Sequence, residues 1–259
     1  LLASNCPASC TRILFGNMGL DWSDVLQPKS YNNVSRVLSI TIGNSFNIDP
    51  LALDGSATNA CFATTCSASL TTTNANDIII AHIGIQQAAG DLISVSDTAG
   101  LTWTLRKEFN TSQSIQHTYE YYAIATSALS SDSITATADT TRTIFIIAFG
   151  ISGANTVTPF DTHASLPATG STAFATSLSI PISTNNANDF IIGLFANGGA
   201  GATAGNTYTL IQTASTGPMT MAEYKVVSTT QTNLAVNETV VSSQPLTGIA
   251  DAIVQASGI

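Results

Sequence analysis

The chain has 259 residues, of which 44% are hydrophobic and only 9% are charged, and its formal net charge is -9. This composition is too apolar for a disordered chain and too acidic for a protein that binds a nucleic-acid backbone or an anionic membrane. Lysine occurs only three times, whereas serine, threonine and asparagine are abundant. We therefore expect a globular protein with a surface of hydroxyl and amide groups, located outside the cell or on its surface.

The beginning of the sequence is an extension without a counterpart later in the chain. The first residue is Leu1 rather than methionine, which predicts that a signal peptide has been removed. No apolar run approaches the roughly 18 residues of a membrane-spanning helix. We therefore expect no membrane insertion, and we assign residues 1–36 to an N-terminal extension that serves as a donor or linking segment.

A short apolar strand is expected directly after this extension, over Val37–Gly43. Its alternation places Leu38, Ile40 and Ile42 on one face. Two interpretations stay open. The strand could extend the edge of the first folded unit, or it could act as an assembly strand that pairs with an open sheet edge of another subunit.

An internal repeat predicts the architecture of the remaining chain. Cys61–Ile80 and Ala173–Ile192 align without a gap, and about half of their positions are identical. Shorter matches follow at 100–105 with 205–210 and at 119–122 with 221–224. A repeat of this kind indicates two copies of one structural unit. We assign these units to residues 37–153 and 154–259.

Each unit has the pattern of an all-β sandwich. Short apolar segments alternate with Gly, Asn, Asp and Ser at intervals typical of β-sandwiches. The strands expected in the first unit are Ser67–Thr72, Asp77–Ile85, Leu92–Asp97, Leu101–Glu108, His117–Thr126, Ser133–Asp139 and Thr143–Ile151. The predicted fold is therefore two tandem, homologous β-sandwich units, of jelly-roll or immunoglobulin-like type.

Four cysteines form two close pairs in the sequence, Cys6 with Cys10 and Cys61 with Cys66. Neither pair has the spacing of a zinc or redox motif, so disulfides are expected in an extracellular protein. Cys61 and Cys66 are an odd number of residues apart and would face opposite ways on a continuous strand. This favours bridges from the N-terminal segment to the first unit, although all three connectivities remain open.

The sequence contains no recognisable catalytic or cofactor motif. The three histidines, His82, His117 and His163, lie on separate expected elements, and His82 is interpreted as an ordinary strand residue. The glycine-rich segment 197–205 lacks the Lys-Ser/Thr ending of a phosphate-binding loop. We therefore expect a protein that is not an enzyme and that has no cofactor.

Aspartates are sparse, but two pairs lie close together in the sequence, Asp21 with Asp24 and Asp91 with Asp97. Carboxylates of this kind could contribute to a structural calcium site, which needs six to eight oxygen ligands. In sandwiches, however, loop aspartates more often bind backbone amides in turns. The Asn-Asp sequences at 76–77 and 188–189 recur before the same strand of each unit and predict such a shared turn.

Aromatic residues could form a platform for carbohydrate, and sequons permit glycosylation without arguing for it. Tyr122, which recurs as Tyr224, is expected in the core. The opposite strand face, with Tyr119 and Tyr121, would then be exposed as a sugar platform or pack against the second unit. Glycosylation sequons occur at Asn33, Asn110 and Asn237.

Three segments carry a resemblance to known proteins: Asn76–Ile80 (NDIII), Val95–Thr104 (VSDTAGLTWT) and Tyr121–Ala123. Together they resemble a β-sandwich pattern of secreted microbial and phage-tail surface proteins. This resemblance covers roughly residues 60–259 and implies a fold without an activity. The composition and the N-terminal extension are similar to those of archaeal extracellular filament subunits, which assemble by donor-strand complementation, although two units depart from their common single sandwich.

These observations predict a structural subunit of an extracellular filament or surface layer whose partners are copies of itself. The alternative is an adhesin, or a phage tail or capsid decoration module, that binds surface glycans. Loss of assembly after deletion of residues 1–43 would favour the first hypothesis, and glycan binding by a monomer or trimer would favour the second.

Overall fold

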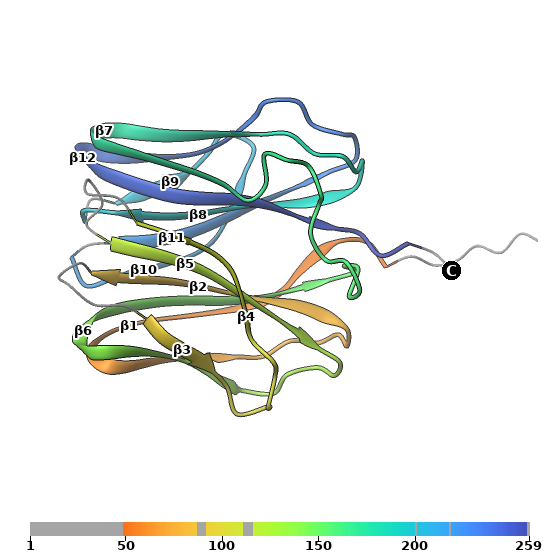
Figure 1. Ribbon diagram of the computed structural model, residues 1–259, viewed down its shortest axis with the longest axis horizontal. Coiled ribbons are helices and arrows are strands. Elements are labelled where there is room, and N and C mark those ends of the chain that lie inside the picture. Colours follow the sequence, from red (N-terminus) through yellow and green to blue (C-terminus); the bar gives the residue numbers. More distant parts are fainter. Residues whose placement is uncertain (1–48, 87–91, 111–115, 200, 218, 258–259) are drawn as a thin grey trace, which may run out of the picture. The chain divides into compact units, whose positions relative to one another are not determined.

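The structure is a computed structural model that describes residues 49–86, 92–110, 116–199, 201–217 and 219–257 (Figure 1). These residues belong to one compact unit, Phe46–Ile259, of which Leu1–Ser45 is not a part. The extension at 1–36 and the strand at Val37–Gly43, with Leu38, Ile40 and Ile42, therefore lie outside the described residues. Both predicted sandwich regions contribute to the one compact unit.

The described residues form twelve β-strands, which confirms the all-β prediction. The strands are β1 (Ala52–Leu70), β2 (Asp77–Gln86), β3 (Leu92–Ser96), β4 (Thr104–Phe109), β5 (Gln116–Ala125), β6 (Asp132–Ser152), β7 (Ala168–Ile182), β8 (Asp189–Asn197), β9 (Ala202–Ala204), β10 (Thr209–Ser215), β11 (Met219–Val227) and β12 (Leu234–Val254). Within this part of the chain, no helix has the length and hydrophobicity that a membrane span requires.

The strands form two antiparallel six-stranded sheets with the same topology. The first sheet has the order β1-β6-β2-β5-β4, with β3 paired to β6. The second has the order β10-β11-β8-β12-β7, with β9 paired to β12. If the six strands of each sheet are numbered from one to six along the chain, both sheets have the spatial order 1-6-2-5-4, with strand 3 paired to strand 6. The predicted repeat in sequence thus corresponds to two sheets with one common strand order.

Each sheet folds back on itself because its two longest strands bend. The pairing of β1 with β6 shifts between Ala63 and Thr65, and that of β12 with β7 shifts between Thr239 and Gln244. Both bends lie at the end of the unit opposite the C-terminal residues (Figure 1). The sequence predicted β6 as two separate strands and found only the last part of β1, because a bend in a continuous strand resembles a break between two strands.

Three apolar layers result from this arrangement. One cluster fills the interior of the first folded sheet, a second fills the interior of the second, and a third lies between the two sheets. Along β2, Ile79 and Ile83 point into the first interior, whereas Ile78 and Ile80 point into the shared layer. The central strands are apolar on both faces because each face is covered by a different layer.

The fourth strand begins later than the sequence predicted. The alternation over Leu101–Glu108 suggested a strand, but β4 starts at Thr104. The carboxylate of Asp97 accepts hydrogen bonds from the backbone N–H of Gly100 (2.6 Å) and from the indole N–H of Trp103 (2.7 Å). These bonds hold the segment in a loop, and Trp103 packs against the first interior cluster.

The preference for disulfides from the N-terminal segment to the first unit is wrong for Cys61 and Cys66. These two residues are bonded to each other, with Cα atoms 5.5 Å apart. The parity argument assumed a continuous strand, but the register shift between Ala63 and Thr65 resets the alternation and brings both side chains to the same side. Cys6 and Cys10 lie outside the described residues.

Gly150 in β6 provides a test of the close packing between strands. A methyl group at this position would lie 2.6 Å from the backbone oxygen of Asp54 and 2.8 Å from Cγ2 of Thr72. Because a backbone atom cannot move away without disturbing β1, Gly150→Ala should destabilise the protein by about 1–3 kcal/mol in urea unfolding. The matched change Gly201→Ala, which meets no atom within 4 Å, should have little effect. Equal midpoints for both variants would contradict this packing.

Candidate functional site

The layer between the two sheets contains a cluster of ionisable side chains among mostly apolar residues. It is built on a β-bulge that occurs at the same place in both sheets. In the pairing of β4 with β5, Arg106 is the extra residue between Leu105 and Lys107. In the pairing of β10 with β11, Ile211 is the extra residue between Leu210 and Gln212. Arg106 and Ile211 are therefore structurally equivalent.

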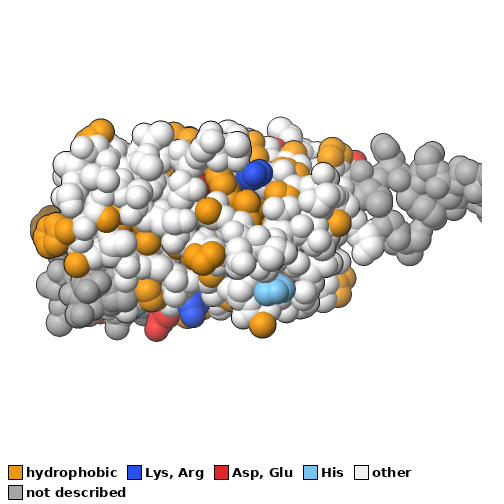
Figure 2. All heavy atoms as spheres, turned by 90° about the horizontal axis from the view of Figure 1, so that it is seen from above, with side chains coloured by type: hydrophobic (Ala, Val, Ile, Leu, Met, Phe, Trp, Pro, Cys, Tyr) orange, Lys and Arg blue, Asp and Glu red, His pale blue; other side chains and the backbone are white. Residues whose placement is uncertain are grey.

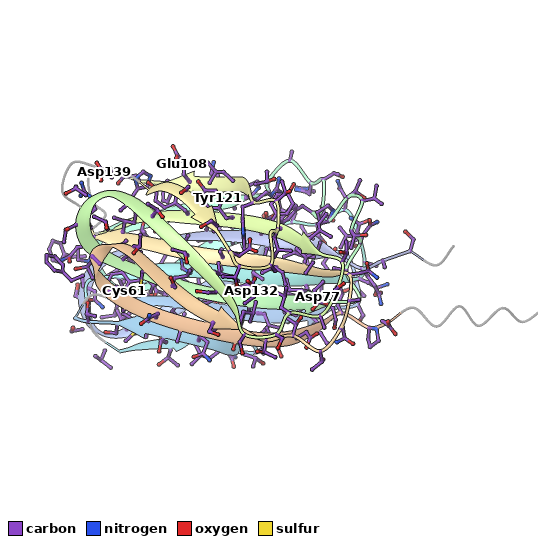
Figure 3. The ribbon with its side chains drawn as sticks, turned by 90° about the horizontal axis from the view of Figure 1, so that it is seen from below. Cys61, Asp77, Glu108, Tyr121, Asp132 and Asp139 are labelled. Carbon is purple, nitrogen blue, oxygen red and sulfur yellow. A yellow bond between two sulfur atoms is a disulfide. The ribbon has the colours of Figure 1, made fainter. Side chains whose placement is uncertain are left out.

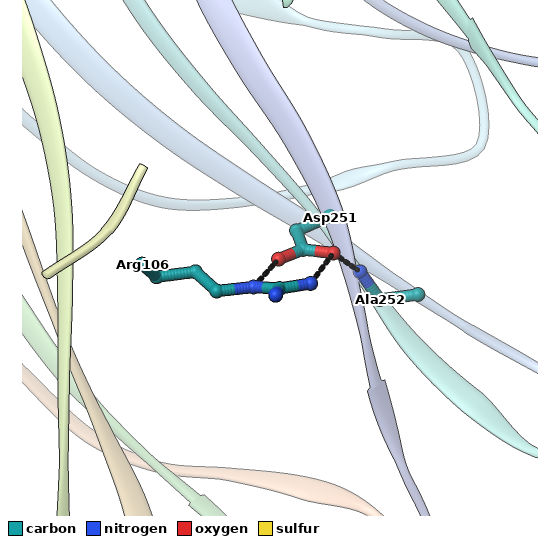
Figure 4. A network of polar contacts seen from close by, with 3 residues as sticks. All are labelled: Arg106, Asp251 and Ala252. Atoms are coloured by element: carbon teal, nitrogen blue, oxygen red, sulfur yellow. Dashed lines mark hydrogen bonds and ion pairs between the residues drawn. The ribbon is translucent and has the colours of Figure 1, made fainter. Parts of the chain in front are cut away.

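Arg106 of the first sheet forms a buried ion pair with Asp251 of the second (Figure 4). Its Nε lies 2.7 Å and its Nη2 3.3 Å from the two carboxylate oxygens of Asp251, which is completely buried. The Asp251 carboxylate also accepts the backbone N–H of Ala252 at 2.9 Å. The guanidinium group stacks over the ring of Phe160, 4.2 Å from its centroid. This bidentate geometry, with the carboxylate buried and the Arg106 side chain 23% exposed, is among the strong arrangements of an Arg–carboxylate pair.

A third ionisable group, Glu120 on β5, completes the polar site. Glu120 is fully buried, and neither of its carboxyl oxygens has a hydrogen-bond partner among the described residues. Burial and the charge of Asp251 raise the pKa of Glu120, although Arg106 opposes this shift. Burial also raises the pKa of Asp251, but the hydrogen bonds from Arg106 and Ala252 oppose this shift, so Glu120 is the better proton holder of the two.

The equivalent trio on the other side of the shared layer is apolar. The strand registers match Arg106, Glu120 and Asp251 with Ile211, Ala222 and Phe149, respectively. All three of these counterparts belong to the shared apolar cluster. The two sheets thus face each other through equivalent surfaces, and the ionic trio is present at only one of the two equivalent places. The polar trio distinguishes the first sheet from the second.

Each sheet also carries a pair of neighbouring carboxyl groups near the chain termini. In the first sheet, Asp54 accepts hydrogen bonds from the backbone N–H groups of Thr73 (2.9 Å) and Asn74 (2.7 Å). Burial alone would raise the pKa of Asp54, but these hydrogen bonds outweigh burial and lower it. Asp77 is completely buried, and burial together with Asp54 raises its pKa to about 7. One carboxyl group is therefore ionised and its neighbour protonated in mild acid.

The same pair recurs in the second sheet. Asp161 accepts the backbone N–H groups of Asn185 (2.9 Å) and Asn186 (2.7 Å). These bonds outweigh burial and lower the pKa of Asp161, whereas burial and the charge of Asp161 raise the pKa of Asp189 to about 7. The recurring Asn-Asp sequence predicted a shared turn. The structure adds that the turn amides bind the other aspartate of each pair.

A further pair of acidic residues lies inside the second sheet. Glu223 accepts the backbone N–H of Gly205 at 2.6 Å, and Glu238 accepts a bond from the Asn197 side chain at 3.2 Å. Burial raises the pKa of Glu223 to about 7, and burial with the charge of Glu223 raises that of Glu238 to about 8. Raised carboxyl pKa values are common at acid–base catalytic sites. Both side chains are completely enclosed, however, so a substrate could not reach them.

Six strands have only one partner among the described residues and therefore one unpaired edge, namely β1, β3 and β4 of the first sheet and β7, β9 and β10 of the second. The β1 and β10 edges are linked by side-chain hydrogen bonds, from Thr58 Oγ1 to the Thr213 carbonyl (3.3 Å) and from Gln212 Nε2 to Ser56 Oγ (3.2 Å). The β4 edge is charged, because Lys107 and Glu108 follow Arg106. The β7 edge contains no charged side chain among its fifteen residues, and Pro181 lies near its end, which leaves the segment before it open.

The expected aromatic platform is not a surface feature. Tyr119 is 2% exposed and belongs to the interior cluster of the first sheet, and Tyr121 packs against that cluster. The prediction that this face is exposed or meets the second unit is wrong, because the folded sheet covers its own face. Tyr122, on the opposite face, meets the second half of the chain through Phe160, 4.9 Å away between ring centroids.

The structure describes only some of the remaining predicted site residues. Asn110 is exposed directly after β4, whereas Asn237 is half-buried in β12 opposite Ser179. Asn33, Asp21, Asp24 and Asp91 lie outside the described residues. The Asp97 carboxylate binds amide and indole groups, which leaves it poorly suited to calcium. In the part of the chain that the structure describes, no group of three His, Cys, Asp or Glu side chains could hold a metal ion.

His82 lies in β2 as predicted and is completely buried, and burial lowers its pKa to about 3. His117 and His163 lie on different parts of the fold, where His117 contacts the hydroxyl of Tyr119 (2.7 Å) and His163 the hydroxyl of Ser165 (2.9 Å). The described histidines thus do not converge on one site.

Comparison of the chain with protein-family models, with curated proteins and with solved structures found no match.

The buried acids predict that the protein is more stable in mild acid than in weak base. Asp77, Asp189, Glu223 and Glu238 keep their protons in the folded state up to about pH 7 to 8, whereas in the unfolded chain they lose them near pH 4. The folded state therefore binds more protons in this window, and its stability falls as pH rises. The lowered pKa of His82 makes stability rise with pH instead, but this is a single group against four acidic groups.

We expect the free energy of unfolding to be higher at pH 5 than at pH 8 by at least about 1 kcal/mol. The double variant Asp77→Asn, Asp189→Asn should reduce this difference, because neutral amides replace two of the titrating groups. Urea titrations at both pH values measure the effect. A protein that is more stable at pH 8 would contradict the assigned protonation states.

The ionic trio gives a second prediction. Arg106→Met leaves Asp251 buried without its partner and should cost about 3–5 kcal/mol. The triple variant Arg106→Ile, Glu120→Ala, Asp251→Phe copies the equivalent apolar trio and should recover to within about 2 kcal/mol of the wild type. Urea unfolding of both variants provides the measurement. A triple variant as unstable as Arg106→Met would show that the two sides of the shared layer are not equivalent.

Proposed function

We propose that the chain is a structural subunit of an extracellular filament, in which copies are joined by β-strand addition. The acceptor is the β7 edge, and the added strand is residues 37–43 of a neighbouring copy. The observation that carries this proposal is the uncharged β7 edge, which pairs only with β12 within the described residues. Unpaired edges without charge or other protection are templates for strand addition.

The choice of β7 follows from the condition of the other edges, of which β3 and β9 have only five and three residues. A strand added at β1 or β10 would have to displace the side-chain bonds that link them. A strand added at β4 would approach Lys107 and Glu108, which are typical of edges that resist pairing. At β7, the exposed residues include small and hydroxyl side chains such as Ala173 and Thr176. An incoming strand meets no charge there.

The proposed donor strand supplies both backbone and apolar interactions. Each net backbone hydrogen bond contributes roughly 1 kcal/mol. Burial of Leu38, Ile40 and Ile42 would contribute roughly 1.5–3 kcal/mol for each side chain. The disulfide between Cys61 and Cys66 supports the extracellular location, since such bonds persist in oxidising compartments.

We also propose that the two halves of the unit arose by duplication of one β-sandwich. The equal strand order, the matching bulges at Arg106 and Ile211 and the recurring aspartate pairs support this origin. On this proposal the shared layer is an internal version of a symmetric dimer interface, where one surface meets its own equivalent.

A peptide-binding experiment tests the donor strand. A protein that lacks residues 1–43 should remain folded, because the compact unit begins at Phe46, but it should no longer form filaments. A synthetic peptide of residues 34–46 should bind to this truncated protein, as measured by fluorescence anisotropy. A peptide with Ile40→Lys should bind at least about tenfold more weakly, because the change places a charge on its apolar face.

The full-length protein serves as the control for assembly, followed by negative-stain microscopy and light scattering. Filaments that still form without residues 1–43, or equal binding of both peptides, would refute strand donation by this segment.

A further inference from the structure

Exposed large hydrophobic side chains gather at the two ends of the unit. At the end with the strand bends, Phe62 of β1 is 77% exposed and Phe174 of β7 is 76% exposed. The gapless repeat alignment matches these two residues with each other. Figure 3 shows the neighbouring Cys61 and Asp139 at this end, with Asp77 toward the other. Hydrophobic side chains are also visible at the same end in Figure 2. We call this the bend end.

The opposite end, where the described chain starts at Asp49, carries a hollow lined by apolar residues together with Asn188, Ser228 and Gln255. The side chain of Gln255 donates a hydrogen bond to the Asp49 carbonyl (3.3 Å), so both ends of the described chain meet here. The hollow has a volume of about 250 Å³, and its lining includes Leu51, Val226 and Val227. A cavity of roughly 150 Å³ can hold benzene, so a phenyl ring has room in this hollow. We call this the terminal end.

The terminal end has a further exposed apolar side chain. Val157 lies in the loop that follows the bridge between Ala154 and Gln255, and it is 87% exposed. Val226 in the lining of the hollow is itself 47% exposed. The phenylalanines at one end and the hollow with its neighbouring apolar side chain at the other are two different surfaces that could bury apolar groups against each other. A contact between two different surfaces of the same chain generates a ring or an open polymer rather than a two-fold dimer.

The length of the connecting chain supports the same arrangement. Only five residues lie between the end of the donor strand at Gly43 and Asp49, and the six Cα–Cα steps span at most about 20 Å. A donor strand must therefore pair close to the terminal end of its own copy. The acceptor edge of the neighbour can satisfy this requirement if the bend end of that neighbour lies against the terminal end, since β7 reaches its bend near Ala175.

We propose that copies of this chain stack end to end, with the bend end of one copy seated on the terminal end of the next. One of the two phenyl rings, Phe62 or Phe174, enters the hollow beside Leu51 and Val226, and the other covers Val157. This contact rests on the proposed filament function and defines the partner surface for it. The donor strand then closes the joint by pairing along β7 of the same neighbour.

The test uses the full-length protein and a matched pair of double variants. Phe62→Ser, Phe174→Ser removes both rings of the bend end. The control, Leu105→Ser, Leu210→Ser, removes two equally repeated side chains that are exposed by 42% and 45% on the edge strands β4 and β10. Sedimentation velocity across a concentration series gives the critical concentration for assembly, and thermal unfolding checks that each variant is folded.

We expect the phenylalanine variant to raise the critical concentration at least about tenfold, since each 1.4 kcal/mol of lost contact energy is a factor of ten. The leucine variant should assemble at the wild-type concentration. Binding of the peptide of residues 34–46 to a Phe62→Ser variant that lacks residues 1–43 should be unchanged within about twofold, because Phe62 lies on β1, whereas the donor strand contacts β7.

The outcomes separate this inference from the proposed function. If the phenylalanine variant assembles at the wild-type concentration, the end-to-end contact is refuted, and strand donation stands if the peptide binds. If the wild type and the protein without residues 1–43 assemble equally, strand donation is refuted, and the phenylalanine variant still decides the end contact. A wild-type chain that stays monomeric at every concentration refutes both. Val226→Asp provides an independent check, because a charge in the hollow should raise the critical concentration as the serine changes do.

Discussion

The apolar layer between the two sheets is the interaction on which the remaining structure depends. It covers one face of the central strands of each sheet, while the folded long strands cover the other face. Because these strands are buried on both sides, neither sheet could keep its apolar residues from water without the other. The ion pair between Arg106 and Asp251 lies within this layer at one of two equivalent positions. A buried pair of this kind adds little net stability, but it strongly disfavours arrangements in which either charge lacks its partner.

Burial on this scale also explains the unusual protonation of the protein. The chain has few charges, and several of its carboxyl groups lie inside the fold rather than on the surface. Their raised pKa values follow from burial first and from neighbouring carboxylates second. Each sheet keeps one ionised aspartate, Asp54 or Asp161, at the centre of a turn, where backbone amides stabilise its charge. The folded protein is therefore expected to be more stable in mild acid than in weak base. Its surface carries mainly hydroxyl and amide groups in place of charged groups.

The sequence predicted the elements that depend on local patterns. The strand at Asp77–Ile85 and the repeat that relates it to Asp189 were visible from alternation and identity. The bends of β1 and β6 were not, because a register shift and a loop have similar polar sequences. The same register shift explains why the prediction from the odd spacing of Cys61 and Cys66 was wrong.

The ionic trio was not predicted, although the repeat contained a signal for it. The alignment of Gly100–Leu105 with Gly205–Leu210 matches Arg106 with Ile211. Because isoleucine at this position indicates a core site, an arginine there indicates a buried acidic partner for its charge. Burial of Tyr119 could not be predicted, since it depends on how the sheet folds over itself.

The central claim is that β7 accepts a strand from another copy, and hydrogen exchange measured by mass spectrometry tests it most directly. Amides of β7 from Ala168 to Thr176 should exchange at least about tenfold more slowly in filaments than in the subunit that lacks residues 1–43, because new hydrogen bonds protect them. Amides of β1 from Ala57 to Ala63, which pair with β6 as Ala168 to Ala175 pair with β12, should exchange at similar rates in both states. Unchanged exchange in β7, or new protection at β1 or β4 instead, would contradict the account.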